Sequence, residues 1–129
     1  MRRSPRAVLR AAVRAAVLSG APSTAITLAR RDDLLESTRA VGGGSVLAGG
    51  AAHVAISLFW GVVLSAVLPR RRAVLAGAAA GLAIAAVDLG LIGRRLPAIR
   101  PLDPWPQLLD HVAYGAVVGA VLGRLSRRR

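Results

Sequence analysis

Five side chains that can exchange protons or bind ions lie within otherwise apolar stretches of the sequence. They are His53, Asp88, Asp110, His111 and Tyr114. A carboxylate inside a membrane-spanning helix costs about 2.5–3.5 kcal/mol on insertion scales, so it is normally paired or faces a wet cavity. These residue types could form one site that handles protons or ions. The alternative is structural: Asp88 and His111 could form a hydrogen bond that fixes the register of two helices.

Other kinds of site have less support. Two His and two Asp could bind one metal ion, but the spacings H-x-x-x-H and E-x-x-H are missing, so we expect no metal site. The signatures G-x-S-x-G and H-E-x-x-H are also missing, as is a phosphate-binding loop. The chain has no Cys and therefore no thiol chemistry. We expect no catalytic residues, no enzymatic activity and no cofactor.

The elements that must position these side chains are long and apolar. Hydrophobic residues make up 54% of the 129 residues and aromatic residues only 3%, with a mean hydropathy of +0.53. This composition, rich in small residues, is typical of helices that pack in lipid. The sequence predicts an all-α integral membrane bundle, formed by a single domain (1–129). Its four transmembrane helices are expected at about 7–29, 46–68, 73–93 and 105–123.

Small residues recur at helical spacing in the predicted spans. The glycines of the last two spans follow one another at intervals of four: Gly77 and Gly81, then Gly115, Gly119 and Gly123. Residues four apart share a helical face, and glycine faces let helix backbones approach closely. We therefore predict an antiparallel, up-down bundle packed through Gly, Ala and Ser faces, as in a glycine zipper. Packing the last two glycine faces together would bring Asp88 level with His111.

The second predicted span carries a similar face, which includes His53 and Ser57, while Phe59 and Trp60 are expected to point elsewhere. The first span differs, because Arg6, Arg10 and Arg14 line one side of its first half together with Arg3. That half is predicted to lie amphipathically among lipid headgroups.

Pro22 predicts a kink near Gly20 in the first span. A signal peptide is the rival hypothesis, although two Arg interrupt its apolar region and no clean A-x-A site follows.

The distribution of charge predicts how the chain is oriented across the membrane. All eighteen basic residues are Arg, the net charge is +12, and the Arg residues gather between the apolar stretches. Membrane flanks explain this pattern better than nucleic-acid binding, which we do not expect. Twelve Arg lie on the cytoplasmic side if the N-terminus is cytoplasmic, against six outside. The positive-inside rule thus predicts a multi-pass protein of the bacterial inner membrane with both termini cytoplasmic.

Two stretches carry a resemblance. The segment GAPSTAITLARRDDLLESTRAVGG, followed by spans rich in small residues, resembles uncharacterised small four-span membrane proteins of GC-rich bacteria. The ending HVAYGAVVGAVLG, with His111-x-x-Tyr114-Gly115-x-x-x-Gly119, resembles the last helix of small inner-membrane families related to YagU. The second resemblance implies an inner-membrane protein tied to acid stress. Neither implies catalytic residues.

Two functions follow as expectations. The first is a non-enzymatic structural or accessory protein of the lipid bilayer that forms a homo-oligomer or joins another membrane protein. The alternative is a small proton- or ion-coupled transporter or channel that uses the His/Asp cluster. An intramembrane enzyme built on the same cluster is a third hypothesis.

Overall fold

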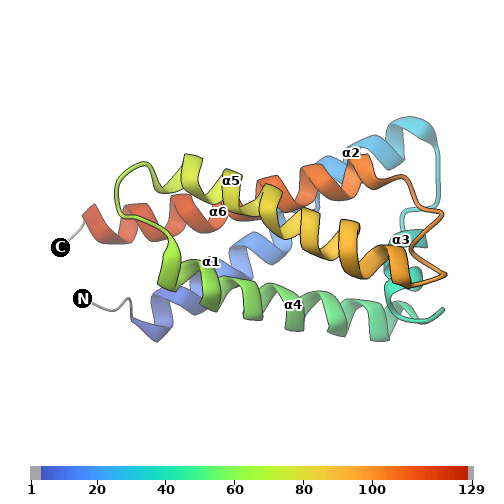
Figure 1. Ribbon diagram of the computed structural model, residues 1–129, viewed down its shortest axis with the longest axis horizontal. Coiled ribbons are helices and arrows are strands. Elements are labelled where there is room, and N and C mark those ends of the chain that lie inside the picture. Colours follow the sequence, from blue (N-terminus) through green and yellow to red (C-terminus); the bar gives the residue numbers. More distant parts are fainter. Residues whose placement is uncertain (1–3, 128–129) are drawn as a thin grey trace.

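The computed structural model describes the backbone of residues 4–127 and the side chains of residues 4–124 (Figure 1). All the regular elements of this part of the chain are helical. The long helices run up and down beside one another, and the start of α1, the α4–α5 turn and the end of α6 lie at the same end. Arg2, Arg3, Arg128 and Arg129, which are among the twelve Arg predicted to be cytoplasmic, lie outside the described residues.

The first apolar stretch folds as α1 (Pro5–Leu18) and α2 (Ala21–Arg30). Ser4 caps α1, because its hydroxyl accepts a hydrogen bond from the N–H of Ala7 at 3.3 Å. The helix breaks at Ser19 and Gly20, and α2 restarts with Pro22 in its first turn. The predicted kink is therefore confirmed.

A polar connection leads to α3 (Glu36–Val41) and then to α4 (Val46–Val67). Asp33 organises this connection: its carboxylate accepts a hydrogen bond from the N–H of Leu35 at 2.9 Å and forms an ion pair with Arg39. The turn before α4 uses Gly43 and Gly44 at φ of 61° and 99°, a conformation that favours glycine.

The third apolar stretch is one continuous helical segment whose helix type changes along its length. It begins as α5 (Ala73–Val87), continues as the π-helix η1 (Asp88–Ile92) and ends as the 3₁₀ helix η2 (Gly93–Arg95). Arg72, just before α5, has left-handed dihedral angles of φ 55° and ψ 30°. After a proline-rich connection, α6 (Pro104–Arg127) returns antiparallel to α5 (Figure 1).

The most extensive contact in the bundle joins α5 to α6. Gly77 and Gly115 face each other so closely that a Cβ on either would overlap the carbonyl of the other. A Cβ on Gly81 would overlap the carbonyl of His111, and one on Gly119 the carbonyl of Ala73. Without these side chains the two backbones lie in direct contact, as small residues allow in lipid.

The helix α1 packs against both α4 and α6. Gly61 of α4 lies against Ala12 of α1, where an added Cβ would come within 2.6 Å of the alanine Cβ. Leu64, Val118 and Leu122 are the largest fully buried side chains. They close the half of the bundle that lies toward the α4–α5 turn.

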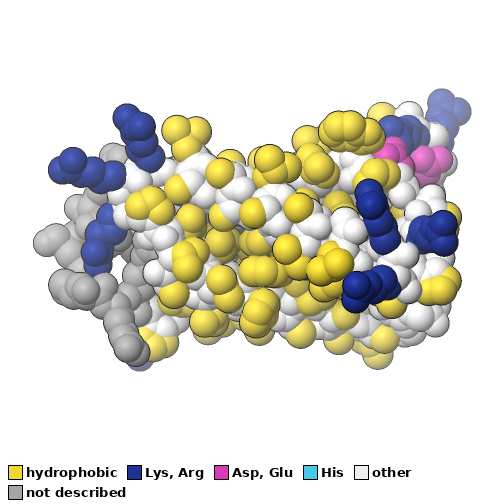
Figure 2. Space-filling model, in the orientation of Figure 1, with side chains coloured by type: hydrophobic (Ala, Val, Ile, Leu, Met, Phe, Trp, Pro, Cys, Tyr) yellow, Lys and Arg dark blue, Asp and Glu magenta, His cyan; other side chains and the backbone are white. Residues whose placement is uncertain are grey.

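The face of the bundle shown in Figure 2 is apolar between two charged ends. Large apolar side chains are widely exposed, among them Leu47 at 85% and Leu75 at 70%. Three stretches are long and apolar enough to cross a membrane: Pro5–Arg30, Val46–Val67 and Ala73–Arg95. The chain thus has the surface and the helices of a membrane protein.

Candidate functional site

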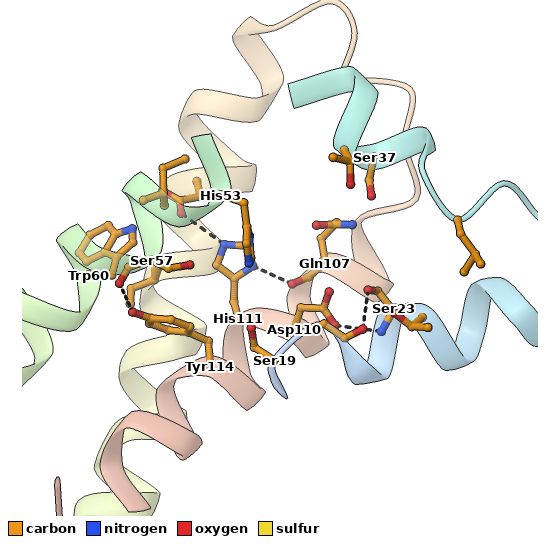
Figure 3. A pocket seen from close by; sticks show the side chains of 17 residues that line it. Ser19, Ser23, Ser37, His53, Ser57, Trp60, Gln107, Asp110, His111 and Tyr114 are labelled. Carbon is orange, nitrogen blue, oxygen red and sulfur yellow. Dashed lines mark hydrogen bonds and ion pairs between the residues drawn. The ribbon is translucent and has the colours of Figure 1, made fainter. Parts of the chain in front are cut away.

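A polar cavity of about 280 Å³ opens near the end of the bundle where α3 and the α5–α6 connection lie. All five candidate residues from the sequence line it, together with side chains of α2 and α3 (Figure 3). No Arg contributes to its described lining, although Arg is abundant at both ends of the molecule. The ionisable side chains of the apolar stretches therefore line one cavity, which is separate from the Arg-rich surface.

Asp88 and His111 meet in this cavity. Oδ2 of Asp88 lies 3.3 Å from Nε2 of His111, and both side chains are about one-fifth exposed. On its other side the imidazole is held by α6 itself, because Nδ1 donates a hydrogen bond to the carbonyl of Gln107 at 2.7 Å. The predicted proximity of Asp88 and His111 is confirmed.

The contact with Gln107 determines how many protons the pair holds. A backbone carbonyl can only accept a hydrogen bond, so Nδ1 of His111 must carry a proton. A hydrogen bond between Nε2 and Asp88 then needs one more proton, either on the imidazole or on the carboxylate. A pair joined by this hydrogen bond is neutral overall, as an imidazolium with a carboxylate or an imidazole with a carboxylic acid.

Asp110 is positioned by α2. Its Oδ1 accepts a hydrogen bond from the N–H of Ser23 at 2.9 Å. Ser23 lies in the first turn of α2, where backbone N–H groups have no partner within the helix. The break between α1 and α2 therefore frees the donor that holds this carboxylate.

The other two candidates bond to the backbone of neighbouring helices. The hydroxyl of the buried Tyr114 donates to the carbonyl of Ser57 and so ties α6 to α4. His53 Nε2 lies 3.0 Å from the carbonyl of Ala16 and ties α4 to α1. These residues line the cavity and also hold its walls together.

Sequence reasoning missed several lining residues. Trp60 was expected to point away from the small-residue face of its helix, yet its side chain lines the cavity, with its ring centroid 5.1 Å from that of Phe59. The signal for Gln107 was its position one helical turn before His111. The signal for Ser23 was its neighbour Pro22, which marks a helix start with free N–H groups.

No metal cluster accompanies the cavity in the part of the chain that the structure describes, where no three His, Cys, Asp or Glu residues lie close enough to hold an ion. Comparisons with protein families, with curated proteins and with solved structures found no match to this chain. Its function must therefore be argued from the geometry of the cavity.

Proposed function

We propose that this chain is a small four-span protein of the bacterial inner membrane, with both termini cytoplasmic, that exchanges protons for small cations. The observation that carries the proposal is the Asp88–His111 pair, which lines a polar cavity inside an apolar bundle. The proposed activity is transport without covalent chemistry, and we expect no cofactor.

The fourth span in this proposal is α6. Its 24 residues would extend about 36 Å as an α-helix, enough to cross the hydrocarbon core. Gln107, Asp110 and His111 lower the hydropathy of its first half, but these side chains face the cavity instead of lipid. An even number of spans, combined with the excess of Arg at the end that holds the α4–α5 turn, supports the cytoplasmic placement of both termini.

The hydrogen bond between Asp88 and His111 requires a proton, and this supports a role of the pair in proton binding. Loss of the shared proton would leave an Asp88 carboxylate facing the lone pair of His111, so the contact would weaken. A cation that entered the cavity would stabilise the two carboxylates in their charged forms and would favour release of that proton. Cation entry and proton release are thereby coupled at one place.

The shape of the cavity supports a carrier over an open channel. Tyr114 and Ile84 line the cavity and are buried, and beyond them Leu64, Val118 and Leu122 fill the bundle. The cavity is thus closed toward the end of the bundle that holds the α4–α5 turn, as expected of a carrier in one of its states.

The glycine contacts weaken the case for a purely structural role. Gly77, Gly81, Gly115 and Gly119 are occupied by contacts within one chain, so they do not argue for association of copies. The same contacts already set the register of α5 against α6. A pair that only fixed helix register would not need a carboxylate within the membrane, where a charged side chain costs free energy.

Flux measurements on purified protein in liposomes test the proposal. Acid-loaded vesicles containing a pH-sensitive dye receive external Na⁺, K⁺ or methylammonium, and the rise of internal pH is followed. We expect the wild type to accelerate this rise with at least one cation, and Asp88→Asn to return the rate to that of protein-free vesicles. Asp103→Asn, which removes a carboxylate outside the cavity, is the matched control and should leave the rate unchanged.

The opposite outcome is equally clear. If the wild type and Asp88→Asn give the same rates with all three cations, the pair does not serve exchange. A structural or accessory role, in which the pair only fixes helix register, would then replace the proposal.

A further inference from the structure

A second hollow, of about 300 Å³, is lined by residues of the α4–α5 turn, the start of α5 and the last turns of α6. These elements lie at the opposite end of the bundle from α3 (Figure 1). The hollow shares no lining residue with the polar cavity. We propose that this hollow, here called the arginine groove, binds an anionic phospholipid. The phosphate would lie against Arg side chains at the rim, and an acyl chain along the apolar floor.

The rim of the groove carries positive charge. Arg70, Arg72 and Arg124 line it, and all three are exposed. No Asp or Glu belongs to its described lining. The guanidinium group offers paired N–H donors that match phosphate oxygens, and Arg is therefore suited to bind phosphate.

The floor of the groove is apolar, and part of its space comes from the missing side chain of Gly123. This glycine leaves α6 bare beside the start of α5, and a Cβ added there would have room, 3.5 Å from the Cβ of Ala73. The wall includes Val74 and Leu75, which are 47% and 70% exposed. Such a floor suits a hydrocarbon chain better than water.

The position of the groove favours a lipid over a soluble phosphate. Arg side chains gather at each end of the apolar band, where lipid headgroups would meet the protein (Figure 2). Basic pockets between transmembrane helices at the membrane surface are known to bind anionic headgroups. A free phosphate could use the rim but would leave the apolar floor uncovered. The inference concerns a different end of the bundle and does not depend on the proposed exchange activity.

Binding measurements on the detergent-purified full chain test the groove. Phosphatidylglycerol and phosphatidylcholine are titrated separately, and bound lipid is counted by native mass spectrometry. We expect phosphatidylglycerol to bind more tightly than phosphatidylcholine, and Arg72→Gln and Arg124→Gln each to weaken it by about fivefold. Arg71→Gln is the matched control, because Arg71 belongs to the same exposed turn but does not line the groove. That variant should bind as the wild type does.

A second variant tests the floor without altering charge. Gly123→Leu should fill the groove and weaken phosphatidylglycerol binding while all Arg residues remain, and its thermal unfolding without added lipid shows whether it folds. Equal binding of the two lipids, or an equal loss in Arg71→Gln, would overturn the proposal. Competition by inorganic phosphate at the concentration of the lipid would identify a soluble-anion site instead, and would overturn the lipid assignment.

Discussion

Asp88 of the π-helix η1 and His111 of α6 lie 3.3 Å apart, at the point where the glycine-packed interface of α5 and α6 opens into the polar cavity. The glycine contacts hold both helices in register, so the two side chains have little freedom to separate. The pair is the most direct link between the packing of the bundle and its proposed chemistry.

This contact predicts coupled effects on stability. Asp88→Asn and His111→Gln should be non-additive in a double-mutant cycle, because each removes the same hydrogen bond. Polar contacts of this kind in membrane proteins average about 0.6 kcal/mol, so the coupling should be of that order. Unfolding in detergent measures it. A second cycle that combines His111→Gln with Asp103→Asn should be additive, and additivity in both cycles would contradict the contact.

The α5–α6 interface predicts a sharp difference between glycines. Gly81→Leu should destabilise the protein by about 1–3 kcal/mol or prevent folding, because even a Cβ there would overlap the carbonyl of His111. Gly90→Leu is the control, since nothing lies within 4 Å of a Cβ at that position. Thermal unfolding in detergent compares them. Equal stability of the two variants would mean that the interface of α5 and α6 is not as tight as described.

The proposed topology predicts the location of reporter fusions. Fusions after residue 38 and after residue 98 should report the periplasm, and a fusion at the C-terminus should report the cytoplasm. A periplasmic C-terminus combined with a periplasmic residue 98 would show that α6 does not cross the membrane. Cytoplasmic signals at both internal sites would reverse the orientation and place the cavity on the inner side.

The ion pair at the cavity end predicts a pH effect. Arg30 donates to Asp103 at 2.6 Å, and this hydrogen bond, together with one from the N–H of Trp105, lowers the pKa of Asp103 below its usual 3.8. A lowered pKa in the folded state gives stability that is present above the unfolded pKa and is lost as pH falls through the folded pKa. The wild type should therefore exceed Asp103→Asn in melting temperature near pH 6, and the difference should shrink below about pH 4.

The size of this effect should be small, because both side chains of the pair are substantially exposed. High salt provides the control: at about 1 M the screening length is near 3 Å, so the difference at neutral pH should diminish. A difference that persists unchanged at low pH would assign it to something other than the ion pair.

Water access to the cavity predicts a pattern of chemical labelling. The chain has no Cys, so single Cys substitutions can be labelled without background. Thr24→Cys lies in the cavity wall at an exposed position and should react with a membrane-impermeant thiol reagent, whereas Val118→Cys, in the fully buried core, should not. Labelling of both variants after denaturation confirms that the thiols are intact. A native Thr24→Cys as inert as Val118→Cys would exclude a water-filled cavity.

The long elements and the Asp88–His111 contact could be predicted from sequence because they depend on periodicity. Apolar stretches indicate helices, and glycines at intervals of four placed both residues at matching distances along two antiparallel helices. The break before Pro22 was predictable because proline lacks a backbone donor. These features are local or follow from one helix pair.

The remaining parts of the site depend on how three or four helices meet. Asp110 bonds to Ser23 of α2, and Trp60 lines the cavity, because α1 and α2 cross toward α6. No spacing along a single helix encodes that crossing. The winding change after Val87 was also not predicted, since the residues of η1 carry no pattern that distinguishes a π-helix from an α-helix.

The π-helix η1 has a consequence for how the chain can vary in length. The N–H of Gly93 bonds to the carbonyl of Asp88, five residues back, so this turn holds one residue more than an α-turn. Removing one residue here would restore α-helical winding and leave the segments on either side close to their present orientation, because the extra residue is confined to this one turn. Gly77 and Gly81 precede the turn and would keep their contacts with α6. The cavity end of the third apolar stretch can therefore gain or lose a residue, whereas its packed half cannot.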